Sequence, residues 1–141
     1  MNDDQIKAVA LALDDPSPIV IKSAAEELAK AGRLTKSILE EALFAEGPER
    51  KRRAAAYALA LMGADSMAIL VKALESQSEA IQETGAYALA RIGETAIDTV
   101  ATCLASMDPQ VRRYAALSLG RHTSEGSGRQ QTEGEGTAAW I

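Results

Sequence analysis

Residues 81–93 read IQETGAYALARIG, and this pattern occurs four times along the chain. The four copies begin at Val20, Lys51, Ile81 and Val111, so that their offsets are 31, 30 and 30 residues. Small or apolar residues recur four, five and eight positions after each start, which places them on one face of a helix. A glycine suited to a left-handed C-cap closes the first three copies, at Gly32, Gly63 and Gly93. Thr123 takes that place in the fourth copy.

A second helical face follows each glycine, with apolar residues spaced i, i+3, i+4 and i+7. Its members are Met67, Leu70, Val71 and Leu74 in one copy and Ile97, Val100, Ala101 and Leu104 in the next. The same face occurs at the start of the chain, at Ile6, Val9, Ala10 and Leu13. The sequence therefore opens on a second helix without its first. The copy near Leu39 and Leu43 is weaker, because Lys36 and Glu40 take positions that are apolar elsewhere.

Helix-start signals separate the repeats. Ser17-Pro18 and Asp108-Pro109 each place a capping residue before a proline at the first helical position, and Ser78 caps without proline. We expect helices at residues 3–14, 18–31, 34–45, 49–62, 65–76, 79–92, 95–106 and 109–121. The short connections make neighbouring helices antiparallel. The predicted fold is all-α, a right-handed α-α superhelix of about eight antiparallel helices.

Two stretches carry a family resemblance: VRRYAALSLG at residues 111–120 and AYALARIG at residues 86–93. They resemble the HEAT-like repeat of the phycobilisome-lyase (PBS lyase) type, and the resemblance covers about residues 4–122. It implies a solenoid that serves as a non-catalytic scaffold for binding another protein or a peptide. The family also includes bilin lyase subunits, so the alternative is an accessory subunit of a bilin lyase or a related chromophore-handling complex. Fold-level similarity alone does not decide between the two.

Composition excludes several classes of partner. Hydrophobic residues make up 47% of the chain and aromatic residues only 4%, and the abundance of Ala and Leu favours closely packed helices. The net charge of −5 argues against a nucleic-acid partner, because such proteins carry a basic surface. The acidic start lacks the apolar run of a signal peptide, and no stretch is long enough to span a membrane. We expect a cytoplasmic protein without a membrane partner.

The sequence predicts no enzyme activity, no catalytic residue, no cofactor and no metal. The single histidine, His122, falls at the end of the last predicted helix. Cys103 aligns with Ala42 and Ala73, which indicates a small packing residue, and a single cysteine forms no intrachain disulfide. No cluster has zinc-site spacing, and neither a P-loop nor a GxGxxG motif is present.

The first candidate partner-binding surface is a run of cations at the start of a helix, comprising Arg50, Lys51 and Arg53. The macrodipole disfavours cations there, and Lys51 occupies a position that is apolar in the other copies. The run predicts a docking patch for an acidic partner. The alternative is a solvated helix start balanced by Glu46 and Glu49. Arg52 shares a repeat position with Arg112, which indicates a structural role for both in a turn between repeats.

The second candidate surface is the outward face of the second helices. Its residues are Lys7, Ser37, Glu41, Ala68, Lys72, Asp98 and Thr102. Their mixed charge suits a protein or peptide better than a phosphate backbone, although each residue is also compatible with a plain solvated position. Tyr57 and Tyr87 share a repeat position and predict packing between repeats, with an exposed aromatic strip as the alternative.

Composition changes near residue 122, which divides the chain into a repeat domain at 1–122 and a tail at 123–141. The tail is rich in Gly, Ser, Glu and Gln and ends in an apolar segment with Trp140, a further candidate for partner binding. The last predicted helix lacks a second helix to cover it. Three explanations remain open: a chain shortened relative to a longer array, a homodimer through the uncapped C-terminal helix, or a tail that docks back onto that end.

Overall fold

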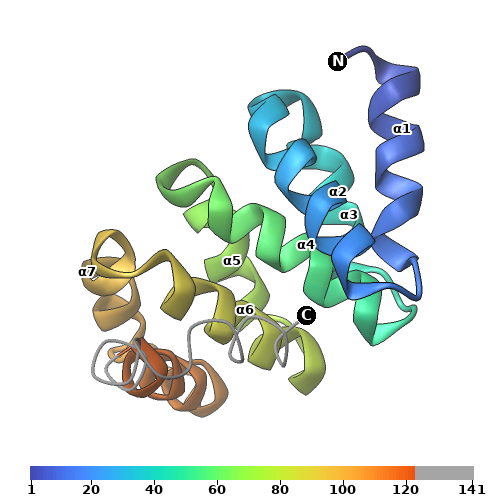
Figure 1. Ribbon diagram of the computed structural model, residues 1–141. Helices are drawn as coiled ribbons and strands as arrows, with labels where there is room; N and C mark the ends of the chain where they lie inside the picture. Colours follow the sequence, from blue (N-terminus) through green and yellow to red (C-terminus); the bar gives the residue numbers. More distant parts are fainter. Residues whose placement is uncertain (123–141) are drawn as a thin grey trace.

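The computed structural model describes residues 1–122, and the predicted tail with Trp140 lies outside the described residues. Seven labelled helices follow one another (Figure 1): α1 Asp3–Leu11, α2 Pro18–Ala31, α3 Lys36–Phe44, α4 Glu49–Leu61, α5 Met67–Leu74, α6 Glu79–Ile92 and α7 Glu94–Cys103. An eighth helix over residues 109–122, called the last helix below, completes the described part. No strand occurs in residues 1–122. The prediction of an all-α, HEAT-like solenoid is confirmed.

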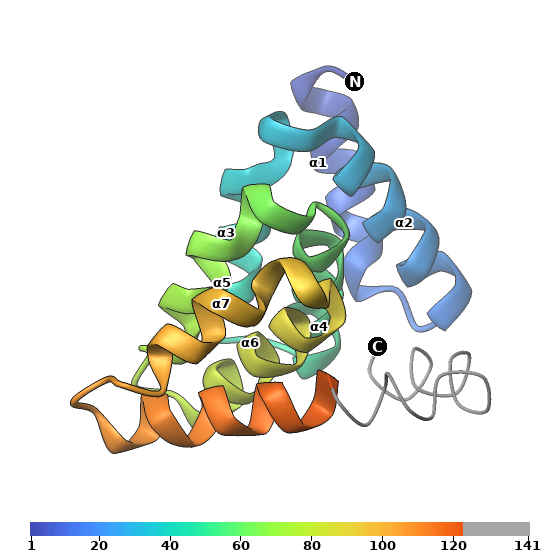
Figure 2. The ribbon, with the colours of Figure 1, turned by 90° about the vertical axis from the view of Figure 1, so that its left-hand side faces the viewer.

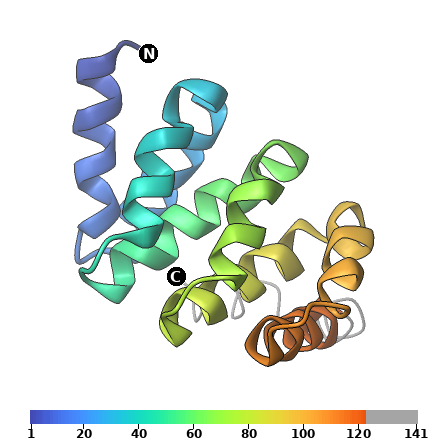
Figure 3. The same ribbon diagram turned by 180° about the vertical axis from the view of Figure 1, so that it is seen from behind.

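The helices form two rows. The first helices of the repeats stack on one another, since α2 contacts α4 and α4 contacts α6. The second helices α3 and α5 contact the first helices that follow them, α4 and α6. Figure 2 places the last helix at the end of the stack farthest from α1, and Figure 3 shows the same order from behind. The stack therefore has two ends, one formed by α1 and α2 and the other by α7 and the last helix.

The turns between first and second helices differ from the prediction in one respect. Gly32, Gly63 and Gly93 have positive φ angles of 63°, 64° and 87°, as a glycine stop requires. The ψ angles of Gly32 and Gly93 are −128° and −144°, so that these glycines adopt an extended conformation open essentially only to glycine, not the left-handed helical one. The chain leaves this point directly into a 3-10 turn at Gly32–Thr35 and Gly63–Ser66, and for this reason α3 and α5 begin later than predicted.

A buried hydroxyl closes two of these turns. Thr35 Oγ1 lies 2.9 Å from the carbonyl oxygen of Leu28 and 2.8 Å from that of Gly32. Ser66 Oγ repeats this arrangement with the carbonyl oxygens of Leu59 and Gly63. The carbonyls of Leu28 and Leu59 belong to the last turn of α2 and α4, where carbonyls lack intrahelical partners, and those of Gly32 and Gly63 begin the 3-10 turns that follow. The hydroxyl thus ties the end of a first helix to the start of its second helix.

Alanine dominates the core. In α4 every residue from 54 to 60 is buried, and five of these seven are alanine. Gly85 of α6 allows a still closer approach, because a Cβ built there would lie 2.7 Å from Ala73 Cβ on α5. The other three copies carry alanine at this position. The α5–α6 contact is therefore tighter than its equivalents.

The predicted caps are confirmed in part. Ser78 Oγ accepts a hydrogen bond from the Ile81 amide, and Asp108 Oδ1 accepts one from the Gln110 amide at 2.9 Å. The side chain of Ser17 makes no capping bond; instead Asp15 Oδ1 accepts from the Ser17 amide at 2.8 Å. Asn2 and Gln5 form a capping box at α1, which the sequence analysis missed.

Candidate functional site

Tyrosine and arginine meet across successive first helices. The guanidinium of Arg91 on α6 lies over the ring of Tyr57 on α4, at 5.0 Å from its centroid. One repeat later, Arg121 on the last helix lies over the ring of Tyr87 at 4.6 Å. Both are cation–π contacts between neighbouring repeats. The interpretation of the two tyrosines as packing residues between repeats is confirmed.

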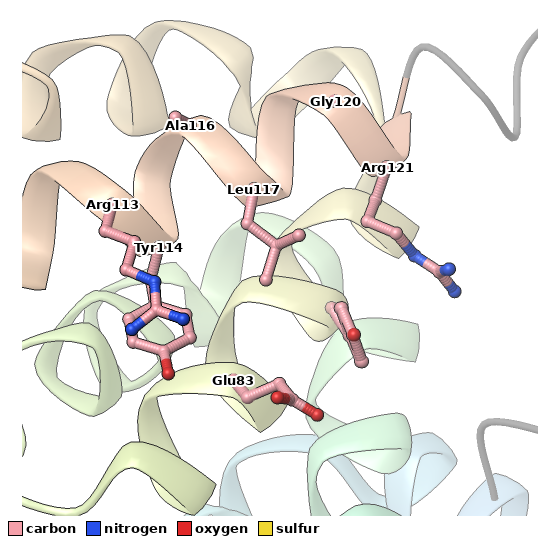
Figure 4. Close-up of a pocket in the computed structure, with 8 residues that line it drawn as sticks. Glu83, Arg113, Tyr114, Ala116, Leu117, Gly120 and Arg121 are labelled. Atoms are coloured by element: carbon pink, nitrogen blue, oxygen red, sulfur yellow. The ribbon is translucent and has the colours of Figure 1, made fainter.

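Next to the second of these contacts lies a groove between α6 and the last helix, with a volume of about 780 Å³. It is lined by Glu83, Tyr87, Arg113, Tyr114, Ala116, Leu117, Gly120 and Arg121. Figure 4 shows Leu117 and Arg113 projecting from the last helix toward α6, which carries Glu83. The groove is open to solvent, so that a side chain of another molecule can enter it.

Two departures from the repeat explain why space is left here. Leu117 occupies the position of Tyr57 and Tyr87, and Gly120 occupies that of Ala60 and Ala90. Both residues line the groove, and both are smaller than their equivalents in α4 and α6. The smaller side chains leave open space beside the last helix, and a Cβ built at Gly120 would have nothing within 4 Å.

The groove combines aromatic, aliphatic and charged side chains. Arg113 lies over the Tyr114 ring at 5.2 Å, and its Nη1 is 3.8 Å from Glu79 Oε1. Both ends of this ion pair are mostly exposed, so water screens it and it contributes little. Burial raises the pKa of the Tyr114 phenol, which Arg113 partly opposes and Glu79 and Glu83 reinforce. The phenol therefore stays protonated at neutral pH and keeps its hydrogen-bond donor.

The predicted basic patch is partly neutralised within the chain. Arg50 Nε lies 3.4 Å from Asp14 Oδ1, and Arg53 Nη2 lies 2.6 Å from Glu49 Oε1. Lys51 is half-buried. The pairing with Glu49 agrees with the alternative of a balanced helix start, and the docking of an acidic partner stays a prediction.

The predicted second-helix face is exposed throughout, at Lys7, Ser37, Glu41, Ala68, Lys72, Asp98 and Thr102. Two of its members already have contacts within the chain. Lys72 Nζ lies 2.8 Å from Glu40 Oε2 on α3 and 5.6 Å from the centroid of the Phe44 ring. Thr102 Oγ1 donates to the Asp98 carbonyl at 3.0 Å. Glu40, a departure from the apolar pattern, therefore bridges two repeats, whereas partner binding by this face stays a prediction.

The other residues that the sequence analysis named lie in turns between repeats, against the core or at the end of the last helix. Arg112 Nη1 donates to the Ser106 carbonyl at 2.7 Å, which confirms its role in a turn between repeats. No such bond is seen for Arg52, whose buried Nε has no hydrogen-bond partner in residues 1–122. Cys103 is half-buried against the core, and His122 lies next to Gly93 at the end of the last helix.

Within the described part of the chain, no three His, Cys, Asp or Glu side chains gather in a way that would hold a metal ion. None of the helices in that part has the length and apolar character needed to cross a bilayer.

The chain was compared with known protein families, and one family model covers most of the repeats. The family model for HEAT repeats matches residues 37–120, which is more than half of the chain. No curated protein matches the sequence. Sequence reasoning missed the groove, although its signal was present: Leu117 and Gly120 each replace a larger residue of the repeat.

Proposed function

The chain belongs to the HEAT-repeat family, and on that premise we propose that it is a non-catalytic scaffold that binds another protein or a peptide. The observation that carries this proposal is the groove between α6 and the last helix. Tyrosine and arginine contribute most to protein interfaces when they surround a pocket that excludes water. The groove is lined by two tyrosines, two arginines and Leu117, and a partner seated in it would exclude water from these side chains.

The chemistry of the groove also suits binding better than catalysis. Its one carboxylate is Glu83, and neither a cysteine, a serine nor a histidine is among the lining residues. The lining therefore lacks the pair of nucleophile and adjacent base that nucleophilic catalysis requires. Stacking on Tyr114 and Tyr87 holds Arg113 and Arg121 in place, which lowers the entropy lost when a partner is bound.

The test is affinity capture with quantitative mass spectrometry, which compares wild type with Arg113→Glu. Lys22→Glu is the matched control, because Lys22 takes the same repeat position on α2, is exposed and lies outside the groove. We expect Arg113→Glu to lose a set of partners that Lys22→Glu retains. A separate Lys51→Glu/Arg53→Glu variant tests the basic patch. Identical partner sets for wild type and Arg113→Glu would contradict a role for the groove.

The finer assignments stay predictions. These are the phycobilisome-lyase subtype, the accessory role in a chromophore-handling complex, the cytoplasmic location and the absence of a nucleic-acid partner. Visible absorbance after incubation with a free bilin tests the second of them. Retention on DNA that falls steeply with salt would contradict the last.

A further inference from the structure

We propose that the outer face of the first helices binds an extended, acidic segment of another protein, with carboxylates on its arginines and an apolar side chain in the groove. This inference rests on the proposed function, since it names the chemistry of the partner that the scaffold would hold. It adds to the groove the neighbouring part of α6 that carries Arg91.

The outer face consists of three repeat positions, which on α6 hold Glu83, Tyr87 and Arg91. Their spacing of i, i+4 and i+8 places them along one side of the helix. Glu83 and Arg91 are exposed, although α4 packs on one side of α6 and the last helix on the other. The outer face is therefore open within the array and not only at the ends of the described residues.

The outer face is positively charged in a chain whose net charge is −5. Its three positions on the four first helices hold two carboxylates, Glu26 and Glu83, and six cations. Charges farther away than about 8 Å are screened in physiological salt, so that the carboxylates elsewhere in the chain do not repel a short segment on this face. An acidic segment is therefore attracted here. The six cations, each exposed or half-buried, are Lys22, Lys30, Arg53, Arg91, Arg113 and Arg121.

Three of the arginines are held over aromatic rings. A guanidinium stacked on a ring directs its N–H groups sideways, in its own plane, where a carboxylate can accept two of them. Arg91 forms no ion pair within residues 1–122, and the ion pair of Arg113 is mostly exposed. The distances from guanidinium to ring centroid are 5.0 Å for Arg91 and Tyr57, 4.6 Å for Arg121 and Tyr87, and 5.2 Å for Arg113 and Tyr114.

The spacing of the arginines favours an extended partner. Arg113 and Arg121 are eight residues apart on the last helix, which corresponds to about 12 Å. Figure 4 shows Leu117 between them. In an extended chain alternate side chains share a face, and two carboxylates four residues apart are separated by about 13 Å. The pattern Glu-x-Leu-x-Glu therefore places a carboxylate near each arginine and its leucine on Leu117.

A helical partner fits this surface less well. Packed helices lie about 8–10 Å apart, whereas a helix with its side chains is about 10–12 Å wide. A helix would thus rest above the groove between α6 and the last helix, while single side chains of an extended segment can enter it.

The test measures the fluorescence anisotropy of a labelled peptide, Glu-Ser-Leu-Ser-Glu-Asp-Asp, during titration with the full-length chain. The first five residues match Arg113, Leu117 and Arg121, and the aspartates supply a carboxylate for Arg91. One control peptide has every acidic residue replaced by its amide, and the other has the same residues with leucine moved to the end. We expect wild type to bind the first peptide more tightly than either control and to release it as salt is added.

Two pairs of variants separate this face from a general effect of charge. Arg91→Glu should weaken binding by about fivefold and Glu83→Gln should strengthen it by about twofold, because exposed charges are partly screened. The matched controls, Lys7→Glu and Glu41→Gln, make the same charge changes on the exposed second-helix face and should bind as wild type does. Circular dichroism checks the fold of Arg91→Glu, whereas a gain of affinity in Glu83→Gln cannot result from unfolding.

Several results would overturn the proposal. They are equal binding of all three peptides by wild type, a loss in Lys7→Glu as large as in Arg91→Glu, and no gain in Glu83→Gln. A single-stranded oligonucleotide of the same length that binds more tightly than the peptide would also overturn it, since this identifies a nucleic-acid surface. If Arg113→Glu loses captured partners but the acidic peptide does not bind, the groove remains a binding site and only the chemistry assigned to its partner is wrong.

Discussion

The second complete repeat, α4 and α5, and the third, α6 and α7, follow the same plan but are closed differently. In the second, the Ser66 hydroxyl joins the end of α4 to the start of α5, and α5 buries Ile69, Leu70, Ala73 and Leu74. In the third, Ala96 replaces the hydroxyl, and α7 buries only Ala96 and Val100. A glycine turn alone is thus enough to set the path of the chain, whereas the hydroxyl and the leucines determine how firmly the pair is held.

The two repeats that differ in this way lie at different places along the stack. The α6–α7 pair, whose second helix buries fewer apolar residues, lies at the end that carries the groove. Elements with few buried apolar contacts open at lower free energy than the core. We therefore expect the C-terminal end to adjust to a partner more easily than the α2–α5 part.

The largest expected effect separates Leu74→Ala from Leu104→Ala, which alter the same repeat position. Leu74 is 0% exposed and Leu104 is 41% exposed. Removal of a fully buried leucine side chain costs about 2–5 kcal/mol, and an exposed one costs much less. Urea unfolding should show a large loss of stability for Leu74→Ala and a minor one for Leu104→Ala. Equal losses would mean that α7 is held as firmly as α5.

Gly85 and Gly120 allow a comparison between a close helix contact and an open helix surface. At Gly85 a new Cβ meets Ala73 Cβ at 2.7 Å, and we expect overpacking to cost about 1–3 kcal/mol, more than the helix propensity that alanine adds. At Gly120 a Cβ has nothing within 4 Å, and Gly120→Ala should stabilise by up to about 1 kcal/mol. Melting temperatures that move in opposite directions would confirm this, and a rise in both would show that α5 and α6 can separate.

The hydroxyl at the turn can be removed from one repeat and added to the other. Ser66→Ala should destabilise by about 1 kcal/mol, because the carbonyls of Leu59 and Gly63 lose a donor away from water. Ala96→Ser should give a smaller gain, since α7 is less buried. Hydrogen exchange of α5 and α7 amides measures both effects locally. No change in α5 protection on Ser66→Ala would exclude the hydroxyl as the cause of the difference.

The smallest expected effect concerns the thiol at the end of α7. Burial raises the pKa of Cys103, and the nearby Glu75 carboxylate raises it further. A raised pKa lowers the thiolate fraction at neutral pH, so that alkylation should be slower than for an unstructured peptide thiol. Glu75→Gln should increase the rate at fixed pH by a modest factor. An unchanged rate would mean that burial alone determines the reactivity.

Most of the fold was predictable because the same pattern of apolar residues and glycines occurs in each repeat. Offsets of 30 and 31 residues identified every helix, and Gly32, Gly63 and Gly93 marked each turn. The backbone conformation of these glycines was not predictable, since positive φ is compatible with more than one ψ. The Glu40–Lys72 bridge was missed because a pattern on one helix does not show which charge lies across from it. The groove is lined by two residues smaller than their repeat equivalents, Leu117 and Gly120, but a sequence pattern does not give the distance between two helices.

The tyrosine–arginine contacts have a consequence for how the chain can lengthen. The two cation–π contacts join Tyr57 to Arg91 and Tyr87 to Arg121, so that each spans one repeat plus one helical turn. A repeat such as residues 64–93 carries both a tyrosine and an arginine at the required positions. A tandem duplication of that segment in the gene would supply both the tyrosine and the arginine of every new cation–π contact at once. The array can therefore gain a unit in a single genetic event without a compensating substitution elsewhere.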